Sequence, residues 1–134
     1  MNIAVDTNIL IRFILADDDA QHTSTLRLFD EADSITIPTI VLCETVWVLQ
    51  RYKIDRQDIA EQINAITNSD KVVVADDEVS AGLSLLEAGG DFADGVAAYV
   101  GRRMSPNGAA AFASFDQTAV RLLSQHGNTA FVPL

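Results

Sequence analysis

Acidic side chains lie beside several buried segments of this sequence, at positions where they can share one site. Asp6 follows the apolar run near the start of the chain, and Asp116 follows another such run. Asp94 lies in the first turn of an expected helix, and Glu44 interrupts an apolar helical segment. Clustered carboxylates repel one another and take up protons unless a cation lies among them. Because all-oxygen ligand sets suit hard cations, these residues predict a site for Mg²⁺ or Mn²⁺.

The chemistry of such a site is phosphoryl chemistry. A Mg²⁺ ion held by a few carboxylates typically serves phosphate substrates. It would polarise a phosphoryl oxygen, activate water for in-line attack and stabilise the leaving oxygen. His22 and His126 lie far from the acidic positions, and Cys43 is the single cysteine, so the sequence has no spacing typical of a zinc site.

Each acid also has an ordinary structural interpretation. Asp6 and Asp116 can each cap the helix that follows them. Asp91 and Asp94 can stabilise their helix through its dipole, and Glu44 can lie on a polar stripe with its neighbour Thr45 and with Gln50. Each signal is weak by itself. Their joint placement near one edge of one sheet is much less expected by chance.

Strands and helices that alternate along the chain must position these acids. The apolar patterns predict strands at residues 2–5, 34–37, 71–75, 109–114 and 129–132. They predict helices at residues 7–15, after 17–19 to about 31, at 39–52, 55–67, 78–88, 91–104 and 116–125. Such alternation favours a parallel sheet with helices on both faces. Ligands in such sheets bind beyond the carboxyl ends of the strands, where strand order reverses.

Length and composition favour one domain over residues 1–134, with 49% hydrophobic residues to build its core. The sequence shows no basic segment before an early apolar run, and no apolar run near the ~20 residues that span a bilayer. We therefore expect a soluble, cytoplasmic protein. The formal net charge of −10 argues against a high-affinity RNA-binding surface, because phosphate neutralisation drives such binding. It does not exclude a nuclease whose acidic site binds metal.

Four segments resemble the motifs of the PIN domain, a family of metal-dependent ribonucleases. They read VDTNILIRFIL, TIVLCETVWVL, DFADGVAAYVG and FASFDQTAV, in this order. The first motif alone is moderately specific, whereas the ordered set is highly specific and extends over essentially the whole chain. Gly95 departs from the family, which commonly has alanine there, and a looser helix beside Asp94 is one interpretation of this departure.

The resemblance implies an α/β fold with three layers, α/β/α, and a five-stranded parallel sheet. It also implies cleavage of single-stranded or structured RNA that depends on Mg²⁺ or Mn²⁺. Carried over by position, Asp6 and Asp94 are the principal metal ligands and catalytic residues. Glu44 and Asp116 complete the catalytic metal site.

Other residues receive supporting roles from the same resemblance. Asp91 matches a frequent extra acid of the third motif, with a role in metal binding. Asn8 and Ser114 match positions that orient ligands or water. The compact length and the third motif look most like VapC-type toxins, which cut tRNA, rRNA or mRNA. Such toxins often form homodimers and are neutralised by a small VapB-like antitoxin.

Two other functions are compatible with parts of the pattern. A phosphoacceptor receiver domain is also a small parallel α/β fold, but it needs paired acids after the first strand and a late lysine. Here Thr7 and Asn8 follow Asp6, and no lysine occurs after Lys71. A PIN-like binding module without catalysis is the second alternative, and the retained acids argue against it.

Contacts with partners are less specific in the sequence. The basic residues that are candidates for phosphate contacts are Arg12, Arg51, Lys53, Arg102 and Arg103, each of which can equally be a solvated surface residue. The segment 39–52 is apolar around much of its circumference. It is either fully buried in the monomer or part of a homodimer or antitoxin interface, with Trp47 as the anchor.

Overall fold

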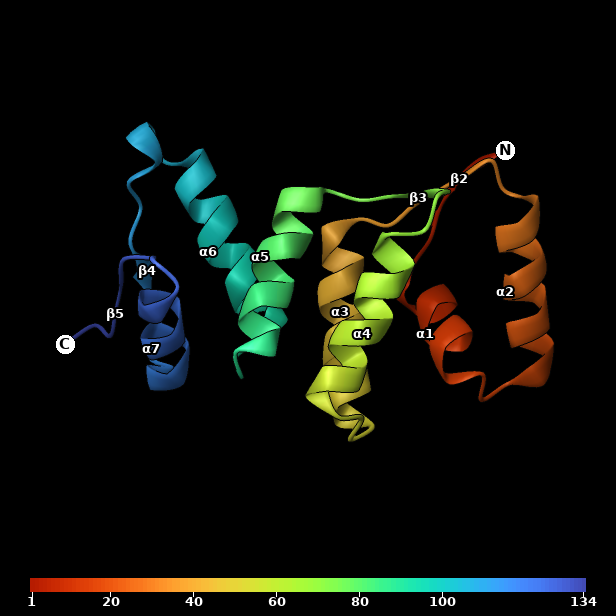
Figure 1. The fold of residues 1–134 in the computed structure, drawn as a ribbon, viewed down its shortest axis with the longest axis horizontal. Helices are drawn as coiled ribbons and strands as arrows, with labels where there is room; N and C mark the ends of the chain where they lie inside the picture. Colours follow the sequence, from red (N-terminus) through yellow and green to blue (C-terminus); the bar gives the residue numbers. More distant parts are fainter. The chain divides into compact units, whose positions relative to one another are not determined.

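The computed structural model describes residues 1–134, which form two compact units, Met1–Ala75 and Asp76–Leu134 (Figure 1). The family-like motifs are divided between them, since the first two lie in one unit and the last two in the other. The expectation of a single domain over residues 1–134 stays a prediction. None of the helices is long and apolar enough to cross a lipid bilayer.

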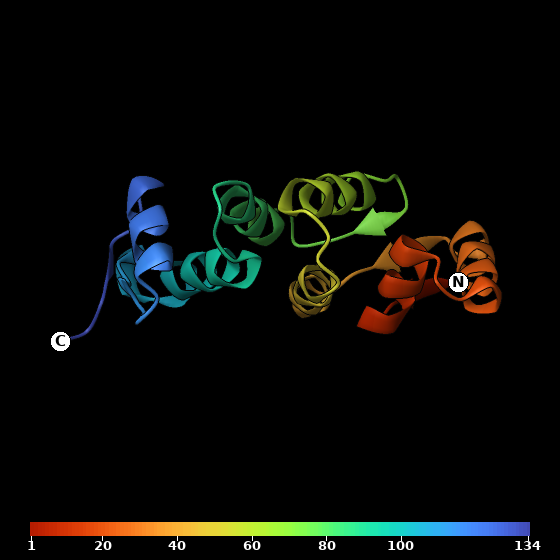
Figure 2. The same ribbon diagram turned by 90° about the horizontal axis from the view of Figure 1, so that it is seen from below.

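The first unit carries a parallel three-stranded sheet and helices α1 to α4. Its strands β1 (Asn2–Ala4), β2 (Ser34–Thr36) and β3 (Val72–Val73) pair in the order β1-β2-β3, and Ile35 of β2 lies opposite Ile3 and Val72. Helix α1 packs against α2 and α3, and α3 lies beside α4 in both views (Figures 1 and 2). The helices are α1 (Thr7–Leu15), α2 (Asp19–Glu31), α3 (Thr39–Arg51) and α4 (Arg56–Thr67).

The second unit consists mainly of helices. The helices α5 (Asp76–Glu87) and α6 (Phe92–Met104) form its largest contact, and α7 (Gln117–Gln125) packs against α6. A 3₁₀ turn, η1 (Pro106–Gly108), follows α6. The strands β4 (Phe112–Ala113) and β5 (Ala130–Phe131) form a parallel pair, and its core includes Leu85, Ala98, Leu122 and Leu123.

The predicted elements are all present, and their ends differ from the prediction by a few residues. The predicted five-stranded sheet is wrong: the strands form a three-stranded sheet and a separate two-stranded sheet. All pairings are parallel, as expected. Apolar periodicity shows which segments are strands and which face is buried, but it carries no information on which strands become neighbours.

Helix α3 buries one face and exposes apolar side chains on the other. Leu42, Val46 and Leu49 are fully buried, whereas Ile40 and Trp47 expose 68% and 57% of their surface. Complete burial of this segment is therefore wrong. The Arg51 guanidinium lies 4.7 Å from the centroid of the Trp47 ring, so a cation covers part of the exposed indole.

The contact between α5 and α6 depends on two glycines. A Cβ atom at Gly82 would lie 2.6 Å from the Phe92 ring, and one at Gly95 would lie 2.5 Å from the carbonyl oxygen of Ala81. Real Cβ atoms do not approach other atoms so closely. The helices can therefore pack at this distance only because both positions lack a side chain. Gly95 thus allows a close helix contact, which differs from the looser helix suggested by its departure from alanine.

We predict that Gly95→Ala lowers the free energy of unfolding by about 1–3 kcal/mol, because backbone of α5 must move to accept the methyl group. Gly101→Ala is the matched control on the same helix, since no atom lies within 4 Å of its added Cβ. The control should gain about 0.5–1 kcal/mol from higher helix propensity. Urea melts measure both values. Equal stability of the two variants would contradict the packing argument.

Candidate functional site

Asp6 joins β1 to α1 and caps the helix. Its backbone is extended, and its Oδ1 accepts a hydrogen bond of 3.0 Å from the backbone N–H of Ile9. The capping interpretation is therefore confirmed. No hydrogen bond engages Oδ2, so the second oxygen of this exposed carboxylate remains available for a ligand.

Glu44 lies on the exposed face of α3, and Thr7 holds its carboxylate. The Thr7 hydroxyl donates a hydrogen bond of 3.0 Å to Glu44 Oε2, which links the residue after Asp6 to the middle of α3. The sequence did not single out Thr7 as a site residue, although it stands inside the first motif. The feature that could have indicated Thr7 is a small hydroxyl-bearing side chain directly after the aspartate that follows the first strand.

The Glu44 side chain is exposed, although apolar residues surround it in the sequence. The polar stripe with Thr45 is wrong. Thr45 is fully buried, and its hydroxyl donates to the carbonyl oxygen of Val41 at 2.7 Å. The apolar residues around Glu44 in the sequence lie on both faces of α3. Glu44 lies on the exposed face with Ile40 and Trp47.

The second unit places two further aspartates at helix starts. Asp91 caps α6, accepting from the N–H of Ala93 at 3.3 Å, and Asp116 caps α7, accepting from the N–H of Ala119 at 3.1 Å. Ser114 Oγ in turn accepts from the N–H of Asp116 at 3.0 Å. This contact fixes the junction between β4 and α7, and it gives Ser114 a positioning role toward Asp116.

Asp94 lies in the first turn of α6, and its charge interacts with those of Asp91 and Asp116. Partial burial raises the pKa of its carboxyl above the ordinary value, and the negative charges of Asp91 and Asp116 raise it further. Asp94 is therefore close enough to Asp91 and to Asp116 to be repelled by both. Such repulsion is relieved by a proton or by a cation.

The structure thus brings the predicted residues together in two sets. The first unit holds Asp6, Thr7 and Glu44, and the second holds Asp91, Asp94 and Asp116 with Ser114. No three carboxylate, imidazole or thiol groups are arranged to hold a metal ion. The hypothesis that all the acids converge on one site stays a prediction. Asn8 is exposed, and its side chain makes no hydrogen bond.

The donor chemistry of the second unit fits a hard cation. Its carboxyl groups offer only oxygen, and Asp91 and Asp116 each use only Oδ1 for capping. A divalent ion near Asp94 would offset the burial and the repulsion that together raise the pKa of this residue. Within the first unit, the Asp6 Oδ2 and the Glu44 carboxylate are oxygen ligands of the same kind.

Two of the candidate residues for phosphate contacts are already paired with acids. Arg12 forms an ion pair of 2.8 Å with Asp17, and Arg103 forms one of 3.0 Å with Glu78. Arg102 differs from both, because its Nε is buried and has no hydrogen-bond partner. Local sequence patterns do not distinguish the environments of these three arginines.

Comparison with known families matches residues 3–121 to the PIN domain. The match covers most of the chain and includes all four motifs. PIN domains are generally nucleases and typically use divalent metals. Among curated proteins and among solved structures, none matches the chain.

We predict that Asp94→Asn makes the metal-free protein more stable at neutral pH. The folded pKa of Asp94 is raised, so the folded state holds its proton more tightly than the unfolded state. The wild type therefore loses stability as pH rises from the ordinary value of 3.8 through the folded pKa. The advantage of the variant should be full above that window and vanish below it.

Denaturant melts in EDTA across this pH range measure the difference. Glu61→Gln, which removes an exposed carboxylate from α4, serves as the control for the change of charge. A pH-independent difference between Asp94→Asn and wild type would refute the electrostatic origin.

Proposed function

The chain belongs to the PIN domain family, and from this premise we propose that it is an endoribonuclease dependent on Mg²⁺ or Mn²⁺. The observation that carries the proposal is the Asp94 carboxyl, whose pKa is raised by burial and by Asp91 and Asp116. Carboxyl groups whose pKa is raised by burial and by neighbouring charges are often found at functional sites, where they bind a charged ligand. The family match supplies the kind of reaction.

We propose Asp94 and Asp116, with Asp91 as an additional acid, as ligands of the ion in the second unit. Asp6 and Glu44 are the proposed ligands in the first unit. The bound ion supplies Lewis acidity and an activated water for hydrolysis of a phosphodiester bond. Thr7 orients the Glu44 carboxylate, and Ser114 fixes the loop that carries Asp116.

The helix caps add rigidity to this arrangement. Because Oδ1 of Asp6 and Oδ1 of Asp116 are held by backbone N–H groups, neither carboxylate can rotate freely away from its junction. A site that is held in place before the substrate binds loses less freedom during the reaction. The same bonds leave one oxygen of each carboxylate without a competing partner.

The finer proposal is the toxin component of a VapBC-like toxin–antitoxin pair, acting on RNA in the cytoplasm. It is supported by the family match over residues 3–121 and by the exposed apolar side chains of α3, Ile40 and Trp47. We propose that this stripe forms part of a homodimer or antitoxin interface. Given the net charge of −10, an inhibitory partner should carry basic residues toward the carboxylates.

We predict that the purified protein cleaves single-stranded RNA with Mg²⁺ or Mn²⁺ and is inactive in EDTA. Asp6→Asn and Asp94→Asn should each lower the cleavage rate by about 100-fold or more, because even residues behind the ligands typically contribute 10–100-fold. Asp70→Asn, an exposed acid outside both sets, should keep wild-type activity. Gel assays with labelled RNA measure the rates, and circular dichroism verifies folding.

Folded wild-type protein that cleaves no RNA under these conditions would reject the nuclease and favour a non-catalytic binding module. Near wild-type cleavage by either active-site variant would instead reject the role of that residue alone.

A further prediction concerns Trp47. Because Trp47 is 57% exposed, Trp47→Ala should change the free energy of unfolding by only about 0.5 kcal/mol. It should weaken self-association or antitoxin binding by roughly 2 kcal/mol, the cost typical of an interface hot spot. Sedimentation at several concentrations and denaturant melts measure the two effects.

Phe115→Ala is the matched control for this variant, since Phe115 is an aromatic side chain that is 80% exposed in the other unit. A Trp47→Ala protein that stays associated but loses several kcal/mol of stability would place Trp47 in a core and contradict the interface.

A further inference from the structure

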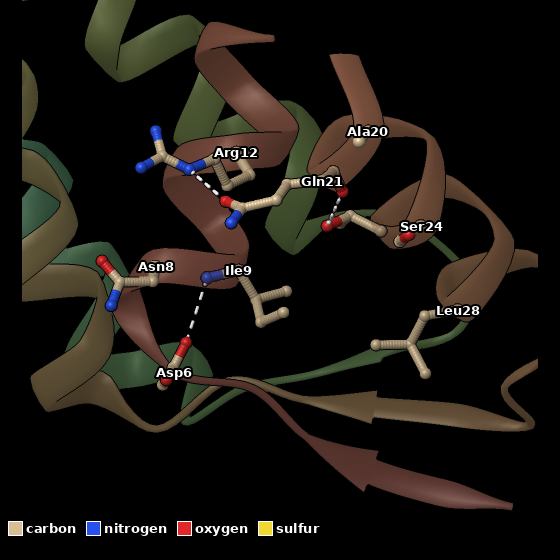
Figure 3. Close-up of a pocket in the computed structure, with 9 residues that line it drawn as sticks. Asp6, Asn8, Ile9, Arg12, Ala20, Gln21, Ser24 and Leu28 are labelled. Atoms are coloured by element: carbon tan, nitrogen blue, oxygen red, sulfur yellow. Dashed lines mark hydrogen bonds between the residues drawn. The ribbon is translucent and has the colours of Figure 1, made fainter. Parts of the chain in front are cut away.

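A cleft of about 430 Å³ lies between α1 and α2, beside Asp6 (Figure 3). This volume is within the range of roughly 300–1,000 Å³ typical of ligand sites. In Figure 3, the Ile9 side chain points toward α2, which presents Gln21, Ser24 and Leu28 to the same space. The cleft therefore adjoins a carboxylate of the proposed active site.

The cleft is formed before any ligand binds, because Arg12 ties the two helices together. Its guanidinium donates to both carboxylate oxygens of Asp17, at 2.8 and 3.0 Å, and to Gln21 Oε1 at 2.7 Å. Its carbonyl oxygen lies 2.9 Å from His22 Nδ1. These contacts hold the end of α1 against the first turns of α2, which keeps the walls of the cleft at a fixed separation.

The charge of the cleft favours a neutral ligand. Arg12 is the only basic residue that lines it, and Asp17 already neutralises this charge. Asp6 at its edge repels anions. A phosphate group therefore gains little here. The apolar surfaces of Ile9 and Leu28, next to the polar groups of Gln21 and Ser24, suit a flat ligand with apolar faces and a polar edge.

Gln21 presents a defined hydrogen-bonding group to this space. Arginine Nε can only donate, so the atom that accepts from it must be the amide oxygen of Gln21. The Gln21 amide nitrogen consequently keeps its two donors, which no other group of the protein engages. Glutamine at this third position of a helix often turns back to cap the helix, but here Asp18 caps it alone.

We propose that the α1–α2 cleft binds one nucleobase of the RNA substrate next to the cleaved phosphodiester, and that Gln21 determines which base is accepted. A nucleobase is neutral, has apolar faces and carries acceptors on its edge, and unstacked bases are what proteins read in single-stranded RNA. Glutamine amides read base edges elsewhere in nucleic-acid recognition. The assignment to an RNA base rests on the proposed function.

Two substitutions separate base recognition from structural support. Gln21→Glu keeps the acceptor for Arg12 but replaces the amide donors with a second acceptor. Gln21→Leu removes both groups at similar size. Gln62→Glu, an exposed glutamine on α4, is the control with the same change of charge.

The first experiment cleaves a random-sequence single-stranded RNA pool and sequences the product ends. Wild type and Gln62→Glu should share a base preference at one position beside the cleaved bond. Both Gln21 variants should lower that preference by about 10-fold, the discrimination of one good base contact. Cleavage with an unchanged preference in both Gln21 variants would overturn the inference.

The second experiment needs no catalysis. Amide resonances of the wild-type protein are followed by NMR during titration with adenosine, guanosine, cytidine, uridine and inorganic phosphate. At least one nucleoside should shift the Ile9 and Ser24 amides, with the response lost in Gln21→Leu, and phosphate should not. Nucleoside binding without RNA cleavage rejects the nuclease but supports the cleft, whereas a response to phosphate alone, or to none of the probes, overturns it.

Discussion

The first turn of a helix leaves backbone N–H groups without partners, and this protein satisfies them with aspartates. Asp6, Asp18, Asp91 and Asp116 each accept a backbone hydrogen bond at the start of a helix. Asp6, Asp91 and Asp116 are also among the residues predicted to bind a metal ion. The capping bond fixes each carboxylate at its junction, and it leaves one oxygen available. The structural and chemical interpretations of these residues are therefore compatible.

The position of Asp94 depends on a different constraint, the close packing of α5 and α6. Gly95 allows the backbones to approach, and its neighbour Asp94 becomes partly buried near Asp91 and Asp116. Burial and like charge raise the pKa of this one carboxyl, while the helix caps remain exposed. A bound cation would relieve the repulsion that Asp91 and Asp116 exert on Asp94. Carboxyl groups whose pKa is shifted by burial and by neighbouring charges often lie at functional sites.

The sequence predicted the elements of the fold well, because helix caps and apolar periodicity are local signals. Helix α1 has its predicted ends at Thr7 and Leu15. The division into two sheets could not be predicted, since strand patterns do not specify neighbours. The site acids were found by their types and places, but the contacts that position them were not. The bond from Thr7 to Glu44 spans 37 positions, and the bond from Arg12 to Gln21 depends on how two helices pack. Such contacts follow from tertiary structure, which no local pattern encodes.

The exposed indole of Trp47 makes the intrinsic fluorescence of the protein sensitive to the surface of α3. Trp47 is the single tryptophan, and it lies on the surface of α3 beneath the Arg51 guanidinium. Its fluorescence therefore comes from a ring that already contacts water in the folded chain, so unfolding alters its surroundings less than it would for a core residue. A partner that covers α3 would displace that water and move the emission to shorter wavelength. The intrinsic fluorescence of this protein should consequently report what lies against α3 more directly than whether the chain is folded.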